Sequence, residues 1–122
     1  MNMEFVTLHV KDLEASFKFY TEILGFKEIT RINPPNGIKI IFLNDEKGMK
    51  LELLYDEHNT VSNGGVVSLG FPVNDIDKTV KYLKEKNVGA LKGPIHIPGG
   101  EKLLFAQDPD GVEIEFIEGF KR

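Results

Sequence analysis

Two glutamates occupy matched places in the sequence and are the first candidates for chemistry. Glu52 and Glu115 each lie in a segment that alternates between apolar and polar residues. Two carboxylates in a partly apolar cavity can transfer protons, hold a hydrated divalent cation weakly, or receive a cationic ligand. Glutamates on an exposed sheet face can equally be no more than solvated side chains. These residue types therefore leave a catalytic, a ligand-binding and a structural role open.

The separation of the two glutamates, 63 positions, is also the offset of an internal repeat. Of the 59 residue pairs that this shift aligns, 12 are identical, and no gap is needed. Average residue usage would give about 3 or 4 identities by chance. We therefore interpret the chain as two copies of one motif. We expect a single domain over residues 1–122, with module one at about 3–57 and module two at about 65–119.

The first copy is predicted to fold as a strand, a helix and three further strands. Residues 4–10 alternate between apolar and polar side chains, which indicates a strand. Asp12 can then cap a helix and Gly25 can end it. The apolar stripe of this helix would consist of Leu13, Phe17, Tyr20 and Leu24. Further strands are expected at 26–32, 38–44 and 49–55, with a tight turn at 44–48.

The second copy repeats this order. A strand is expected at 66–73, followed by a helix that Asp75 caps, and a tight turn at 108–111. The apolar stripe of the second helix would consist of Ile76, Val80 and Leu83. The pattern predicts the α+β class, in which each sheet has one face covered by a helix and one face left open.

The alternation also assigns side chains to the two faces of each sheet. In the strand at 49–55, Leu51 and Leu53 would face the helix and Glu52 would face away from it. The open faces are expected to carry Phe5, Thr7, His9, Glu52, Ser68 and Glu115, together with Phe42 if its side chain points the same way. A half-open sheet that carries carboxylates is a natural place for a ligand or a metal.

Composition excludes several classes of protein and site. The chain has no cysteine, which rules out disulfides, a thiolate zinc site and a cysteine nucleophile. Its net charge of −4, without a basic stripe, makes nucleic acid an unexpected partner. The longest run of large apolar residues, 40–43, is far shorter than the roughly 20 residues of a membrane span. The first residues lack the pattern of a secretion signal. We therefore expect a cytoplasmic protein with no membrane partner.

Two groups of segments resemble the vicinal oxygen chelate superfamily: residues 10–13, 17–20 and 23–26 in the first copy, and 108–115 in the second. This superfamily includes glyoxalase I, methylmalonyl-CoA epimerase, extradiol dioxygenases, and fosfomycin and bleomycin resistance proteins. The resemblance covers about residues 4–118. It implies paired strand-helix-three-strand modules that form a cupped eight-stranded mixed sheet with helices on the outer face. It also implies a homodimer.

Compared segment by segment, the chain resembles glyoxalase I, a well-described enzyme of this superfamily. The resemblance implies that its divalent metal ligands would fall at Phe5, Glu52, Ser68 and Glu115. The two glutamates match the family pattern, but phenylalanine has no donor atom and a serine hydroxyl is a poor ligand at neutral pH. We therefore expect an incomplete metal site, at which Glu52 and Glu115 would hold a divalent cation only weakly.

Two hypotheses of different classes follow. In the first, the protein binds a small molecule in the cup without the full glyoxalase I metal site, through Phe5, Thr7, His9, Phe42 and Ser68. Bleomycin resistance proteins resemble this case. In the alternative, the protein is a glyoxalase-type lyase or isomerase with a remodelled site, in which Glu52 and Glu115 are the catalytic groups. A purely structural interaction module is a third option.

Overall fold

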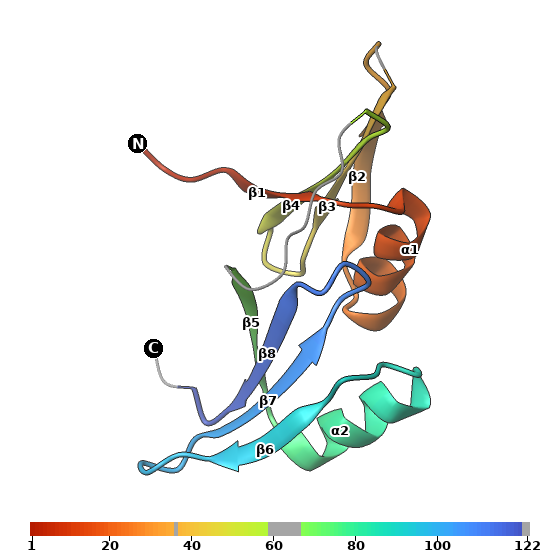
Figure 1. Cartoon of the computed structure of the whole chain (residues 1–122). Coiled ribbons are helices and arrows are strands. Elements are labelled where there is room, and N and C mark those ends of the chain that lie inside the picture. The colour runs from red at the N-terminus through yellow and green to blue at the C-terminus, as the bar shows by residue number, and fades with distance from the viewer. Residues whose placement is uncertain (36, 59–66, 121–122) are drawn as a thin grey trace. The chain divides into compact units, whose positions relative to one another are not determined.

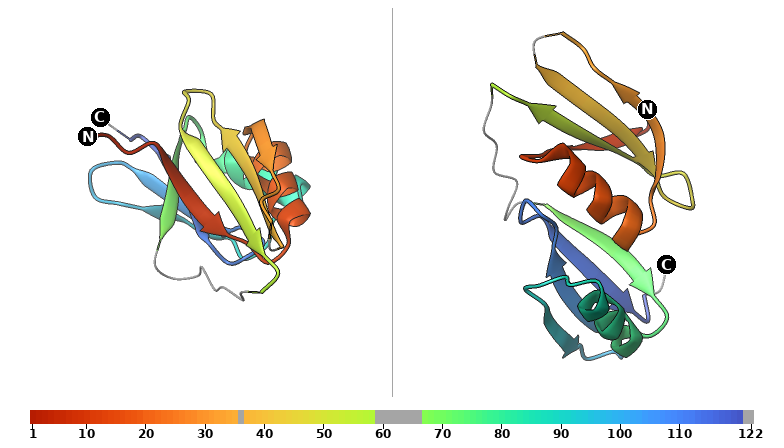
Figure 2. Two further views of the ribbon diagram at one scale, coloured as in Figure 1. Left: turned by 90° about the horizontal axis from the view of Figure 1, so that it is seen from above. Right: turned by 90° about the vertical axis from the view of Figure 1, so that its right-hand side faces the viewer.

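The computed structural model describes residues 1–35, 37–58 and 67–120, and the chain divides into two compact units, residues 1–63 and 64–122. Each unit contains one strand, one helical segment and three further strands, in that order (Figure 1). We call these units module one and module two. Figure 2 lets the reader follow the same chain path through each of them. The repeat in the sequence is therefore a repeat of structure.

Module one begins with β1 and α1 and continues through a π-helical turn, η1, to three strands. The bounds are β1 Phe5–His9, α1 Leu13–Lys18, η1 Phe19–Ile23, β2 Lys27–Ile32, β3 Ile38–Asn44 and β4 Lys50–Asp56. The strand order of the sheet is β1-β4-β3-β2, with β1 parallel to β4 and the other pairs antiparallel. Asp12 caps α1, as predicted, by accepting a hydrogen bond from the backbone N–H of Ala15 at 3.0 Å.

The helix of module one departs from the prediction in its second half. Its α-helical part ends at Lys18, and η1 follows as a wider turn in which the backbone N–H of Leu24 donates to the carbonyl of Phe19 at 3.2 Å. Phe19 and Tyr20 are both buried, and their rings pack edge to face with centroids 5.2 Å apart. Successive side chains of an α-helix point about 100° apart. The wider turn thus accompanies the burial of two neighbouring aromatic residues, which a single apolar stripe does not predict.

Module two has the same topology with a regular helix. The bounds are β5 Ser68–Val73, α2 Ile76–Glu85, β6 Lys92–His96, β7 Lys102–Gln107 and β8 Glu113–Glu118. The strand order is β5-β8-β7-β6, with β5 parallel to β8. Asp75 caps α2, as predicted, by accepting hydrogen bonds from the backbone N–H groups of Asp77 and Lys78 at 3.0 and 3.1 Å. The expected beginning of this module, residues 65 and 66, lies outside the described residues.

The same device closes the last hairpin of each module. Asp45 and Asp108 each accept hydrogen bonds from backbone N–H groups two and four residues later, at 2.8 to 2.9 Å. Gly48 and Gly111 follow with φ of 91° and 85°, a conformation that glycine adopts without steric cost. Both predicted turns are therefore confirmed. They set the register of β3 with β4 and of β7 with β8.

In each module the helix lies against one face of the sheet (Figure 1, Figure 2), and the strand residues on one face are buried. These buried strand residues, which form an apolar layer, alternate along each strand, as the sequence predicted. They are Ile41, Leu43, Leu51 and Leu53 in module one, and Leu104, Ala106, Ile114 and Phe116 in module two. The intervening residues occupy the opposite face, which we call the open face.

The α+β class and the repeated strand-helix-three-strand modules are confirmed. The eight strands form two mixed sheets of four strands, one in each module. The boundaries of the modules and their union in one domain and one cup stay predictions. No helix among the described residues combines the length and the hydropathy that a membrane span requires.

Candidate functional site

Glu52 lies in the middle of β4, on the open face of module one. Only 9% of its surface is exposed, and it is the one acidic residue of the described sheet strands that is buried. The hydroxyl of Thr7 donates to Oε1 of Glu52 at 2.6 Å. This pairing follows from the parallel register, because Thr7 of β1 is directly opposite Glu52 of β4. Oε1 of Glu52 is therefore held in place by the hydroxyl of Thr7.

Two aromatic rings adjoin this carboxyl group. Phe42 of β3 is the antiparallel partner of Glu52. Phe5 of β1 packs edge to face on Phe42, with ring centroids 5.3 Å apart and an interplanar angle of 88°. Phe5 remains 42% exposed. The predicted residues Phe5, Thr7 and Phe42 thus gather around Glu52, and Phe42 does face the open side.

His9 and Lys50 lie further from this centre. His9 pairs with Leu54 at the end of β1 and is partly buried. Lys50 pairs with Phe5 and forms an ion pair with Glu4. The hydrogen bond and the charge of Lys50 hold the pKa of Glu4 below its ordinary value. Lys50 is thus engaged by an exposed carboxylate, that of Glu4, rather than by Glu52.

Glu115 occupies the corresponding place on the open face of module two, with different neighbours. Its parallel partner in β5 is Gly70, which has no side chain, and its antiparallel partner in β7 is Phe105. Ser68 lies two residues before Gly70 in β5, where it pairs with Glu113, and it donates a hydrogen bond to Glu113 rather than to Glu115. The aromatic partner of the repeated glutamate is therefore kept in module two, but the hydroxyl donor is not.

Phe105 and Glu113 are open-face residues outside the set of predicted site residues. Phe105 could have been found from the repeat, because it is the counterpart of Phe42 at the 63-residue offset. Glu113 is the counterpart of Lys50, so this position changes sign between the modules. The joint action of Glu52 and Glu115 stays a prediction, since each belongs to a different module.

The donor atoms on these faces do not fit the metal of glyoxalase I. Beside Glu52, Phe5 offers only a ring that packs on Phe42, and the Thr7 hydroxyl already donates to the carboxyl group. Beside Glu115, Gly70 offers nothing, and the hydroxyl of Ser68 is directed to Glu113. Nowhere in residues 1–35, 37–58 and 67–120 do three or more His, Cys, Asp or Glu side chains form a group suited to a metal ion. A nickel or zinc site needs several nitrogen, sulfur or carboxylate ligands.

Comparison with known proteins agrees with this fold. The chain matches the family model described as the Glyoxalase/Bleomycin resistance protein/Dioxygenase superfamily over residues 2–116. Lactoylglutathione lyase of Haemophilus influenzae is 36% identical, over 91% of this chain and 87% of that protein. A glyoxalase family protein from Enterococcus faecalis has a similar structure, with a TM-score of 0.83 and 22% identity over 96% of this chain and 97% of that one.

A longer solved structure contains a similar fold. A glyoxalase I mutant from Zea mays superposes with a TM-score of 0.82 at 26% identity, over 98% of this chain but only 45% of that one. The family match extends over almost the whole chain and includes both modules. The resemblance noted in the sequence is thereby confirmed, and the chain belongs to the glyoxalase/bleomycin resistance protein/dioxygenase superfamily.

Proposed function

We propose that the protein binds a small molecule on its open sheet faces, without the full metal site of glyoxalase I. The observation that carries this proposal is the environment of Glu52, a buried carboxyl group fixed by Thr7 and flanked by Phe42 and Phe5. A carboxyl group in such a setting accepts hydrogen bonds from a cationic or N–H-bearing group, while the rings contact an apolar body. The ligand class that suits these residues is an arylalkyl or aliphatic amine, which is cationic at neutral pH.

His9, Ser68 and Glu115 extend this proposal beyond the immediate surroundings of Glu52. His9 follows Thr7 on the same face of β1 and would contact a longer ligand. Glu115 and Ser68 would take part from module two. A weakly held divalent cation at Glu52 and Glu115 remains part of the proposal only for the alternative described below.

The test is a thermal-shift screen in buffer that contains EDTA. The probes are a panel of arylalkyl amines such as benzylamine, which are cationic at neutral pH, each paired with the neutral alcohol of the same skeleton. We expect saturable stabilisation by at least one amine, none by its alcohol, and loss of the effect in Glu52→Gln. The response of Glu115→Gln to the same amine tests whether module two takes part in ligand binding. Equal shifts with amines and alcohols, no saturable shift, or an unchanged response in Glu52→Gln would contradict the proposal.

A glyoxalase-type lyase or isomerase is the second candidate. The observation in its favour is the 36% identity to the lactoylglutathione lyase of Haemophilus influenzae over 91% of this chain. Its test is turnover of the hemithioacetal of methylglyoxal and glutathione, with nickel, cobalt, manganese or zinc added in turn. Turnover that is lost in both Glu52→Gln and Glu115→Gln would establish this candidate and displace the first. A tightly bound, stoichiometric metal ion would contradict the proposal that the full metal site is missing.

We also propose that the protein is a homodimer, as the resemblance implies. Light scattering at micromolar protein concentration should give a mass near twice that of the chain. A monomer mass would contradict the dimer but would leave the proposal on ligand binding intact.

A further inference from the structure

The repeat reveals a second candidate site, on the helix side of module one. In module two, Glu118 at the end of β8 receives a hydrogen bond from the backbone N–H of Ile76 at 2.8 Å. The same carboxylate lies 3.7 Å from Nζ of Lys102, its partner in β7. One internal carboxylate therefore joins a lysine, a strand end and the helix that packs on the sheet.

Module one keeps the lysine but lacks the carboxylate. The counterparts of Lys102, Ile76 and Glu118 at the 63-residue offset are Lys39, Leu13 and Tyr55. Lys39 and Tyr55 are paired across β3 and β4, as Lys102 and Glu118 are across β7 and β8. Among the described residues, Lys39 has no ion pair. The cation is thus retained at a place where its partner has been replaced by an aromatic ring.

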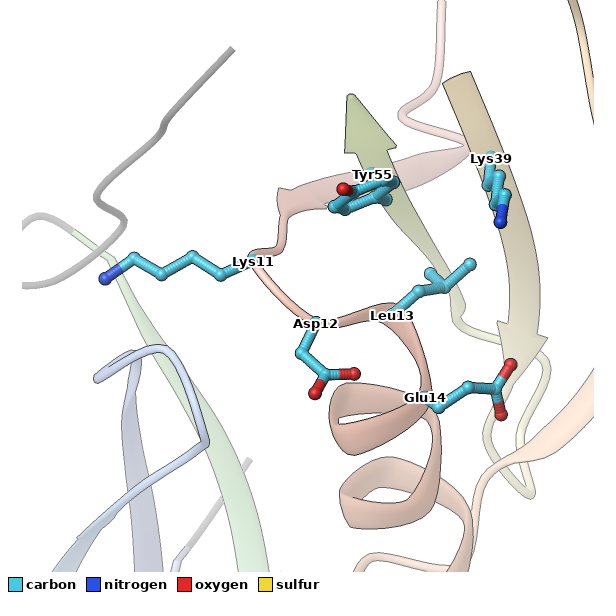
Figure 3. A pocket seen from close by; sticks show the side chains of 6 residues that line it. All are labelled: Lys11, Asp12, Leu13, Glu14, Lys39 and Tyr55. Carbon is cyan, nitrogen blue, oxygen red and sulfur yellow. The ribbon is translucent and has the colours of Figure 1, made fainter. Parts of the chain in front are cut away.

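A pocket of about 370 Å³ occupies this place. Its lining consists of Lys11, Asp12, Leu13, Glu14, Lys39 and Tyr55. Figure 3 shows the Tyr55 ring and the Lys39 side chain on either side of the space above Leu13, with the amino group of Lys39 directed toward the beginning of α1. Lys11 extends away from them. The volume lies at the lower end of the range of small-molecule sites.

The acidic residues of the pocket are already engaged. Asp12 accepts the capping hydrogen bond from Ala15 at 3.0 Å. Glu14 forms an ion pair with Arg31 at 3.0 Å, and Arg31 also pairs with Glu28. These pairs raise the pKa of Arg31, with the hydrogen bond to Glu14 as the largest cause. Glu14 is therefore held by Arg31, and Lys39 is the cation that a ligand would meet.

We propose that this pocket binds a small organic carboxylate. The carboxylate would accept a hydrogen bond from Lys39, in the place where module two has Glu118, and the apolar body of the ligand would contact Leu13 and Tyr55. Lys39, and not the short helix α1, supplies the recognition of charge. The pocket is separate from the site around Glu52, because Lys39 and Tyr55 share the strand face of Ile41 and Leu53, whereas Glu52 lies on the opposite one.

The test is an NMR titration of the full-length ¹⁵N-labelled protein with sodium benzoate. Benzamide serves as the neutral control, and inorganic phosphate as an anion without an apolar body. We expect saturable shifts of the Leu13, Lys39 and Tyr55 amide signals with benzoate only. Lys39→Met should weaken binding about tenfold or more, the expected effect of losing one charge-assisted hydrogen bond. Its matched control, Lys102→Met in module two, should leave benzoate binding unchanged, and so should Glu52→Gln.

A second variant restores the arrangement of module two. Tyr55→Glu would place a carboxylate of the protein beside Lys39, and we expect benzoate binding to be lost while the fold is kept. Shifts of equal size with benzamide, unchanged binding in Lys39→Met, or no saturable shift with benzoate would overturn the proposal. Phosphate binding as tight as that of benzoate would overturn the assignment to an organic acid.

Discussion

The two modules share a scaffold and differ on the surfaces that could meet a ligand. Both helices begin at an aspartate cap, and both last hairpins close on an aspartate and a glycine with positive φ. Both modules have a lysine at the same place in their third strand, β3 or β7. On the open face, however, Glu52 has the hydroxyl of Thr7 beside it, whereas Glu115 has the bare backbone of Gly70.

This comparison distinguishes the residues that each module needs in order to fold from the residues that are available for ligand binding. Caps, turns and buried strand positions are needed by each copy to fold, so they recur at the 63-residue offset. Positions at which the side chain changes from one chemical type to another, and not merely from one apolar residue to another, are free of that need. They include Thr7 and Gly70, Lys50 and Glu113, and Tyr55 and Glu118. The first of these differences lies directly opposite the repeated glutamates, the second lies two residues before them in the same strand, and the third adds Tyr55 to the lining of the pocket beside Lys39.

The largest expected effect concerns the shared scaffold. Ile41 and Leu104 are counterparts, and each is 0% exposed. We expect Ile41→Ala and Leu104→Ala to lower the free energy of unfolding by about 2–5 kcal/mol each, because each leaves a cavity in the apolar layer of its own module. Urea unfolding measures the loss, and hydrogen exchange identifies the module that opens.

The control for this pair is Ile29→Ala on β2, since Ile29 is 47% exposed and has little burial to lose. We expect a change within about 0.5 kcal/mol for this control. If Ile41→Ala and Leu104→Ala both accelerated exchange equally in the two modules, the idea of one core per module would be wrong.

A smaller effect is expected where the modules differ, at Thr7. Thr7→Val keeps the shape of the side chain but removes the hydroxyl that donates to Glu52 at 2.6 Å. A buried polar group that loses its partner costs about 1–3 kcal/mol, so we expect a destabilisation in this range. Urea unfolding measures it. Thr30→Val, on the exposed strand β2, is the matched control and should be nearly neutral.

The same replacement also tests the proposed ligand site. In Thr7→Val we expect the thermal shift caused by an arylalkyl amine to decrease, because Glu52 is no longer held in one position. If Thr7→Val and Thr30→Val had equal stability and equal amine responses, the hydrogen bond between Thr7 and Glu52 would contribute neither to stability nor to ligand binding.

Sequence patterns predicted the scaffold far better than the site. Asp12, Asp75 and the two hairpin turns were predictable because caps and turns depend on a few neighbouring residues. The pairing of Thr7 with Glu52 was not, since the register of two parallel strands 45 residues apart is set by tertiary packing. Alternation assigned both residues to one face but could not make them direct neighbours.

The pocket was missed for a related reason. Its residues come from the beginning of α1 and from two strands, and no short motif joins them. The repeat contained a usable signal, however, because the identity of Lys39 with Lys102 and the replacement of Glu118 by Tyr55 are both visible at the 63-residue offset. Comparing the copies position by position, rather than counting their identities, would have directed attention to Lys39.

The smallest expected effect would make module two more like module one. A Cβ added at Gly70 has no heavy atom within 4 Å, so a side chain fits there. We expect Gly70→Thr to raise the free energy of unfolding by about 0.5–1 kcal/mol, because glycine is unfavourable in a strand and threonine is favoured there. Gly70→Val, which has the same shape without the hydroxyl, is the control. Urea unfolding of the two variants then isolates the new hydrogen bond, since Glu115 is the direct partner of position 70. Equal stability of Gly70→Thr and Gly70→Val would mean that the hydroxyl does not reach Glu115, and that a threonine opposite the repeated glutamate is not sufficient to reproduce the arrangement around Glu52.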